Sequence, residues 1–167
     1  SAVGAEDTLL ATIEYAQKLG VPVLLDAKRG DIGSTADMYA KELFERFRAD
    51  AVTINPYMGQ DAMQPFLDYQ DKGIFILCRT SNPGGSDIQN LMLDSGLTIY
   101  EHVAQKAAND WNEHHNVALV VGATRPEEIG RIRSIVGDME FLLPGVGAQG
   151  ADIQQLMDNG RGGGLTI

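Results

Sequence analysis

Apolar runs alternate along the chain with stretches whose apolar residues recur every three or four positions. The runs span residues 21–28, 51–57, 73–80, 117–122 and 140–146, and a further run begins at 165. Each run is short and bounded by polar or glycine-rich residues, which predicts strands. The stretches between them, about 5–19, 35–48, 60–72, 97–114, 126–136 and 151–159, have the period of amphipathic helices. In the second of these stretches, Leu43, Phe44 and Phe47 have the spacing of a buried helical stripe. The pattern therefore predicts an α/β protein with a parallel sheet covered on both faces.

Two closures of such a sheet fit this pattern, a doubly wound sheet and a (β/α)8 TIM barrel. No G-x-G-x-x-G motif follows the early strands, which weakens the case for a dinucleotide fold. Charged, amide or glycine residues follow nearly every strand, and barrel enzymes build their sites at those ends. We therefore expect residues 1–167 to form a single barrel domain, truncated at both ends, that runs from roughly the third strand to the start of the eighth.

Composition and charge narrow the classes of partner. Hydrophobic residues make up 44% and charged residues 22%, as in globular proteins, and the net charge of −10 argues against nucleic acid or an anionic membrane as partner. Cys78 is the single cysteine, so no disulfide can form within the chain. No apolar run approaches the ~20 residues that span a bilayer. We expect a cytoplasmic protein.

The first strand ends in charge instead of neutral turn residues. Asp26, Lys28, Arg29 and Asp31 directly follow the apolar run 21–25. Since residues i and i+2 of a strand share a face, we expect Asp26 and Lys28 side by side, with Asp31 returning toward Lys28 from the loop. This pattern predicts an Asp–Lys–Asp array at the end of the strand.

An ammonium held between carboxylates stays charged, so it can stabilise negative charge on a substrate carbon and then donate a proton. A carboxylate such as Asp31 would also repel an anionic substrate group, and loss of CO₂ would relieve that repulsion. The residues alone leave two other interpretations open. The charges could form ordinary ion pairs, or Asp26 and Asp31 could bind a metal ion.

The stretch DAKRGDIGST, residues 26–35, resembles the active-site signature of orotidine 5'-phosphate decarboxylase, and most closely the second, larger type of that enzyme. Three further motifs occur in the order found in that family: TSNPG at 80–84, GATRP at 122–126 and PGVGAQG at 144–150. The resemblance implies a (β/α)8 barrel that converts orotidine 5'-phosphate to UMP in pyrimidine biosynthesis. It also implies that the reaction uses no metal ion and no organic cofactor.

The resemblance assigns roles to the charged strand end. Lys28 matches the lysine that stabilises and protonates the C6 carbanion, and Asp26 matches the carboxylate that orients this lysine. Asp31 and Thr35 match residues that reach into the neighbouring subunit's site. A homodimer with shared active sites is therefore implied.

Four later residues match substrate-binding positions of the family. Ser81 matches the serine that hydrogen-bonds the pyrimidine edge, and Gln149 matches the glutamine that bridges pyrimidine and phosphate. Gly147 lies in a glycine-rich turn that could offer backbone N–H groups to the phosphate, and Pro144 matches the apolar pocket around the departing CO₂. Without the resemblance, Ser81 reads as a turn residue and Gly147 as part of a plain loop. The loop 81–96 is long enough to act as a closing lid.

The family also uses a first-strand aspartate, a second-strand lysine and a phosphate-binding arginine, and we expect all three to lie outside residues 1–167. Two alternatives remain: a magnesium-dependent sugar-phosphate decarboxylase or hexulose-phosphate synthase, and a non-catalytic nucleotide-binding barrel. Ser81 and Gln149, in pyrimidine-reading positions, argue against the first alternative. The intact set of Asp26, Lys28, Asp31 and Thr35 argues against the second.

Overall fold

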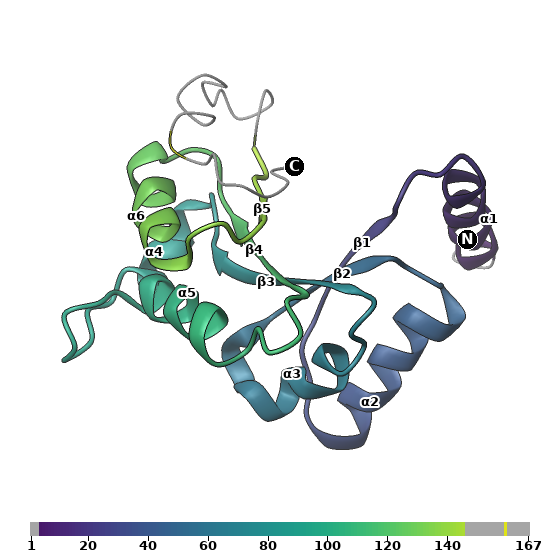
Figure 1. The fold of residues 1–167 in the computed structure, drawn as a ribbon, viewed down its shortest axis with the longest axis horizontal. Helices are drawn as coiled ribbons and strands as arrows, with labels where there is room; N and C mark the ends of the chain where they lie inside the picture. The colour runs from purple at the N-terminus through teal and green to yellow at the C-terminus, as the bar shows by residue number, and fades with distance from the viewer. Residues whose placement is uncertain (1–3, 146–158, 160–167) are drawn as a thin grey trace. The chain divides into compact units, whose positions relative to one another are not determined.

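The computed structural model describes residues 4–145 and residue 159. Five strands follow one another in the sheet in the order β1-β2-β3-β4-β5 (Figure 1). They are β1 (Leu24–Arg29), β2 (Ala51–Ile54), β3 (Gly73–Arg79), β4 (Val117–Val121) and β5 (Phe141–Leu142). The pairs β1–β2 and β4–β5 are parallel. The predicted α/β class and parallel sheet are therefore confirmed.

The helices also follow the predicted pattern. They are α1 (Ala5–Lys18), α2 (Gly33–Lys41), α3 (Gln60–Leu67), α4 (Ser86–Gln89), α5 (Ile99–Asn109) and α6 (Pro126–Val136). The π-helix η1 (Glu42–Arg46) continues α2, and η2 (Pro56–Met58) and η3 (Pro83–Gly85) are single 3₁₀ turns. The helix predicted at 126–136 has the same bounds in the structure. The elements predicted at 151–159 and 165 fall almost entirely outside the described residues.

The loop predicted at 81–96 is partly structured, because η3 and α4 lie within it. A backbone bridge between Met92 and Thr98 then closes the segment ahead of α5. Thr98 caps that helix: its hydroxyl accepts a hydrogen bond from the Glu101 N–H, and the Glu101 carboxylate accepts one from the Thr98 N–H. Such a reciprocal cap marks the start of a helix firmly.

The chain divides into two compact units, with the boundary between Ile74 and Phe75. In the first unit, helices α2 and α3 contact each other. Leu43, Phe44 and Phe47 were predicted to form a buried helical stripe, and all three are at most 6% exposed. The Phe44 ring also packs against Tyr69, with 4.7 Å between ring centroids. The apolar period of the sequence thus predicted the core of this unit correctly.

In the second unit, every residue of β4 is buried, and α5 packs beside α6 (Figure 1). Backbone hydrogen bonds join the strand ends: the Gly122 N–H donates to the Arg79 carbonyl at 2.8 Å, and the Ala123 N–H donates to the Pro144 carbonyl at 2.9 Å. The carboxyl ends of β3, β4 and β5 therefore meet at one edge. Among the described residues, no helix is both long and apolar enough to cross a membrane.

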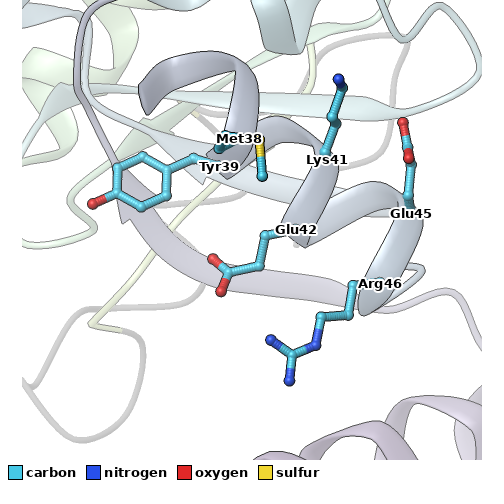
Figure 2. Close-up of a pocket in the computed structure, with 6 residues that line it drawn as sticks. All are labelled: Met38, Tyr39, Lys41, Glu42, Glu45 and Arg46. Atoms are coloured by element: carbon cyan, nitrogen blue, oxygen red, sulfur yellow. The ribbon is translucent and has the colours of Figure 1, made fainter. Parts of the chain in front are cut away.

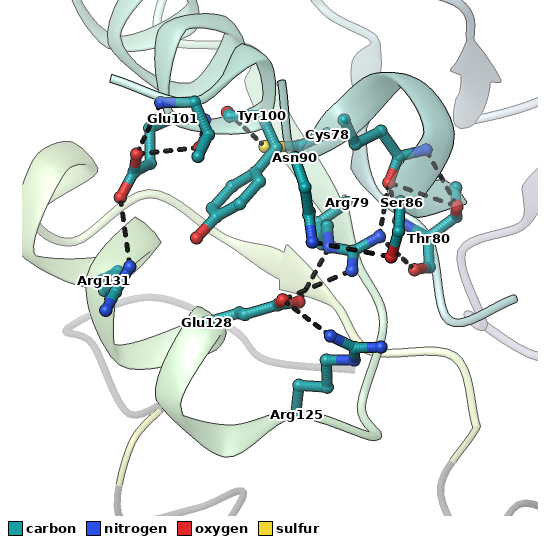
Figure 3. A network of polar contacts seen from close by, with 12 residues as sticks. Cys78, Arg79, Thr80, Ser86, Asn90, Tyr100, Glu101, Arg125, Glu128 and Arg131 are labelled. Atoms are coloured by element: carbon teal, nitrogen blue, oxygen red, sulfur yellow. Dashed lines mark hydrogen bonds and ion pairs between the residues drawn. The ribbon is translucent and has the colours of Figure 1, made fainter. Parts of the chain in front are cut away.

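A buried arginine takes part in a network of polar contacts in the second unit (Figure 3). Arg79, at the end of β3, is only 2% exposed and makes two hydrogen bonds to the Glu128 carboxylate of α6, at 2.7 and 3.3 Å. Arg125 adds a third contact to Glu128 at 3.3 Å. A charge this deeply buried is tolerated only when it is paired and hydrogen-bonded.

The same arginine attaches the segment after β3 to the core. Its Nη1 donates to the Gln89 side-chain oxygen at 2.8 Å and to the Thr80 carbonyl at 3.1 Å. Gln89 in turn donates to the Thr80 hydroxyl at 2.9 Å. A Cβ on Gly85 would lie 2.7 Å from that hydroxyl and 2.9 Å from Arg79 Nη1, so a side chain there would push these hydrogen-bonded groups aside. This segment is held by polar contacts as well as by packing.

Replacing Glu128 should therefore destabilise the second unit strongly. Glu128→Ala leaves the Arg79 guanidinium buried without its main partner, and we expect a loss of about 3–5 kcal/mol in the free energy of unfolding. Urea unfolding of the variant and the parent measures the difference. The exposed neighbour Glu127 provides the matched control, since Glu127→Ala should change stability by no more than about 0.5 kcal/mol. Equal behaviour of the two variants would contradict the role assigned to the buried pair.

Candidate active site at the end of the first strand

Asp26 and Lys28 lie together at the carboxyl end of β1. The Lys28 Nζ is 2.5 Å from each oxygen of the Asp26 carboxylate. Both side chains are about half exposed, at 51% and 56%, so the ammonium is held in place and remains open to a ligand. The sequence prediction that these two side chains share a face is confirmed.

The backbone reaches this geometry through an irregularity in the strand. Leu25 pairs with Val52 and Arg29 pairs with Ile54, so three residues of β1 lie opposite the single residue of β2 between Val52 and Ile54. Lys28 adopts a φ of 46°, in the left-handed region. This conformation costs an ordinary residue about 1–2 kcal/mol, and such strain persists only where surrounding contacts enforce it.

Thr53 is the residue opposite the bulge, and it contacts both members of the pair. Its hydroxyl accepts a hydrogen bond from the Lys28 N–H at 2.9 Å and donates one to Asp26 Oδ1 at 2.8 Å. The side chain is fully buried. Sequence analysis did not identify Thr53. The available signal was a single hydroxyl residue within the otherwise apolar strand 51–54.

The charge state of Asp26 follows from these contacts. Partial burial raises its pKa and is the largest single influence. Hydrogen bonds from Lys28 and Thr53, together with the positive charge of Lys28, outweigh that influence, so the pKa of Asp26 lies below its ordinary value of 3.8. Asp26 is therefore a carboxylate at neutral pH and remains paired with the ammonium.

Asp31 and Thr35 do not join this pair within the chain. The Asp31 carboxylate accepts a hydrogen bond from the adjacent Ile32 N–H at 2.8 Å, and the ion pairs among residues 4–145 do not include one between Asp31 and Lys28. Within the chain, the predicted approach of Asp31 to Lys28 does not form an ion pair. Thr35 lies exposed in the first turn of α2.

The second unit carries the other described candidates. Ser81 is half-buried two residues after β3, and Pro144 is exposed two residues after β5. Gly122 follows β4, where an added Cβ would lie 2.8 Å from the Ser81 backbone nitrogen and 3.0 Å from its Cα. A side chain at 122 would therefore displace Ser81. Gly147 and Gln149 lie outside the described residues.

A surface pocket elsewhere in the first unit involves none of the predicted site residues. It lies along α2 and η1 and is lined by Met38, Tyr39, Lys41, Glu42, Glu45 and Arg46 (Figure 2). Nor do the described residues gather three His, Cys, Asp or Glu side chains closely enough to hold a metal ion. The chemistry-bearing groups of this unit are those at the end of β1.

The pairing of Asp26 makes a testable prediction about pH. Its folded pKa lies below 3.8, so the stability contributed by the pair is fully present above that pH and is lost as pH falls through the folded pKa. A carbon-13 NMR titration of the Asp26 carboxyl should give a midpoint below 3.8, and Lys28→Ala should raise it. A midpoint unchanged in the variant would show that the ammonium does not depress the pKa.

Known proteins that resemble this chain support the same family. A curated orotidine 5'-phosphate decarboxylase of Azoarcus sp. (strain BH72) is 58% identical over 168 residues, which cover 98% of this chain and 62% of that protein. The solved OMP decarboxylase of Leishmania donovani is 46% identical with a TM-score of 0.81, covering 86% of this chain and 56% of that chain. The chain spans about three fifths of the length of the curated relatives that it matches.

A more distant structure has the same fold. The solved orotidine 5'-monophosphate decarboxylase of Methanocaldococcus jannaschii, complexed with inhibitor BMP, is 25% identical with a TM-score of 0.75, and the match covers 95% of this chain and 69% of that chain. Residues 3–163 match the sequence signature of a single family, which is nearly the whole chain. The chain therefore belongs to the Orotidine 5'-phosphate decarboxylase / HUMPS family.

Proposed function

We propose that the protein converts orotidine 5'-phosphate to UMP and CO₂ in pyrimidine biosynthesis, in the cytoplasm. The observation that carries this proposal is the Lys28 ammonium held 2.5 Å from both oxygens of Asp26, in a chain 58% identical to a curated orotidine 5'-phosphate decarboxylase. We further propose one (β/α)8 barrel domain, in which residues 1–167 run from roughly the third strand to the start of the eighth. The likeness to solved OMP decarboxylases supports this architecture.

The proposed reaction needs one fixed cation and one proton. The bond between C6 and the carboxylate carbon breaks, CO₂ departs and the electron pair stays on C6. The Lys28 ammonium stabilises this developing charge, transfers a proton from Nζ to C6 and regains a proton from solvent. Asp26 keeps the ammonium in position, so little reorganisation is needed at the moment of reaction.

Asp31 and Thr35 are proposed to act in the partner's active site within a homodimer. The observation in favour is that Asp31 contacts the backbone of Ile32 and makes no ion pair with the Lys28 of its own chain. The Ile32 side chain beside it is 60% exposed. An Asp31 carboxylate placed near the substrate carboxylate would raise the energy of the ground state and favour loss of CO₂.

The remaining roles rest on the family motifs. Ser81 is proposed to hydrogen-bond the pyrimidine, and the lack of a side chain at Gly122 leaves room for its backbone. Gln149 is proposed to bridge pyrimidine and phosphate, Gly147 to offer its N–H to the phosphate, and Pro144 to line the pocket that CO₂ leaves through. No metal ion or organic cofactor enters this mechanism.

A magnesium-dependent sugar-phosphate enzyme is the second candidate, since the matched family description also names HUMPS. Such an enzyme would need Asp26 and Asp31 as metal ligands. Both oxygens of Asp26 instead face the Lys28 ammonium, and Asp31 accepts from the Ile32 N–H. These contacts, together with relatives described as orotidine 5'-phosphate decarboxylases, favour the metal-free reaction.

The proposed role of Lys28 can be tested by substitution. Lys28→Ala in the natural full-length protein should lower kcat by about 10⁴-fold or more, because both charge stabilisation and proton donation are lost, while UMP binding persists. Loss of the orotate ultraviolet absorbance in EDTA measures turnover. Lys18→Ala, at an exposed lysine of α1, is the matched control and should keep parental activity. A parent that is active only with added magnesium would favour the sugar-phosphate candidate.

The proposed sharing of active sites between subunits can be tested with mixed dimers. Lys28→Ala and Asp31→Asn homodimers should each be nearly inactive, but mixing and reassociating them should restore up to about a quarter of parental activity. Half of the randomly formed dimers are mixed, and each mixed dimer holds one site with an intact Lys28 and an intact partner Asp31. If the reassociated mixture stays as inactive as its components, Asp31 does not act across a dimer.

A further inference from the structure

Thr53 is a buried polar residue with no role in the proposed mechanism. It sits in the middle of β2, between Val52 and Ile54, and its exposed fraction is 0%. A hydroxyl at such a position is costly unless both its donor and acceptor capacity are used. Here both are used, and both partners belong to the candidate active site.

The first contact concerns the backbone of Lys28. In a regular parallel pair, a strand N–H donates to a carbonyl of the neighbouring strand. The bulge breaks that pattern, because three residues of β1 face one residue of β2. At the bulge, the Thr53 hydroxyl accepts a hydrogen bond from the Lys28 N–H at 2.9 Å. This hydrogen bond therefore holds the backbone of Lys28, whose φ of 46° is unfavourable for a residue that is not glycine.

The second contact concerns the Asp26 carboxylate. The same hydroxyl donates its only proton to Asp26 Oδ1 at 2.8 Å. A carboxylate has two oxygens and rotates easily about its last bond, so a fixed donor on one oxygen defines its orientation. That orientation decides where the Lys28 ammonium lies, since both oxygens of Asp26 are 2.5 Å from Nζ.

We propose that the Thr53 hydroxyl is the positioning group of this site, holding the Lys28 backbone and the Asp26 carboxylate together so that the ammonium occupies one place. This inference rests on the proposed function and adds to it a residue outside the matched active-site motifs. Thr53 does not touch the reacting atoms. Its removal should lower the fraction of molecules with a correctly placed ammonium and leave substrate binding nearly unchanged.

Two substitutions separate positioning from packing. Thr53→Val keeps the shape and removes the hydroxyl, which leaves the Lys28 N–H without its acceptor. Thr53→Ser keeps the hydroxyl and removes a methyl group. Ile54→Val, in the same strand and equally buried, is the control for a small loss of packing and should keep parental turnover.

In the natural full-length protein, Thr53→Val should lower kcat by about 10–100-fold, as expected when a catalytic group is misplaced, with KM and UMP affinity changed by no more than about threefold. Thr53→Ser should recover most of the lost kcat. If Thr53→Val retains parental kcat, or if Thr53→Ser loses as much as Thr53→Val, the positioning role is wrong.

A second readout does not depend on turnover. Amide hydrogen exchange at Lys28 should be slow in the parent and in Thr53→Ser, and clearly faster in Thr53→Val. The Asp26 carboxyl titration should move to higher pH in Thr53→Val, because a donor to the carboxylate is lost. Protection at Lys28 that is equal in all three proteins would overturn the proposal. A parent without decarboxylase activity would instead overturn the proposed function, and the exchange experiment would still decide the role of Thr53.

Discussion

Lys28 adopts a left-handed backbone conformation at a bulge in β1, and the candidate site depends on the contacts that keep it there. At this bulge its backbone N–H is directed toward β2. In the structure, that N–H meets the Thr53 hydroxyl, and the same hydroxyl binds Asp26. One buried oxygen atom thus connects a strained backbone, a carboxylate and an ammonium. Neighbouring structure enforces strain of this kind where the geometry serves a function.

In the second unit, a buried charge at a strand end is also held by hydrogen bonds, here from an ion pair. Arg79 brings a full positive charge into the interior at the end of β3, and Glu128 of α6 neutralises it. The remaining donors of the guanidinium hold Thr80 and Gln89, so the segment that carries Ser81 begins from a rigid base. In both units, a polar side chain from a neighbouring strand or helix holds a charged side chain at a strand end: Thr53 binds Asp26, and Glu128 binds Arg79.

The apolar period predicted much of the fold. It marked β1 to β5 within a few residues, gave the bounds of α6, and identified Leu43 and Phe44 as core residues. It did not predict α4 or the π-helix after α2, because short helices depend on local contacts such as those between Gln89 and Thr80. The motif at 26–35 directed attention to Asp26 and Lys28, and their pairing is confirmed.

The sequence alone determined which residue types follow each strand, the α/β class, and the shared face of Asp26 and Lys28. Periodicity predicts which side of a helix or strand is buried, and the motif at 26–35 indicates which reaction the site could carry out. Neither gives the register between segments 25 residues apart, so the bulge and the contact from Thr53 to Lys28 could not be foreseen. Nor does the spacing show that the Asp31 carboxylate accepts a hydrogen bond from the Ile32 N–H. Tertiary structure decided these features, because hydrogen bonds across strands and at helix starts depend on positions in space that sequence spacing does not specify.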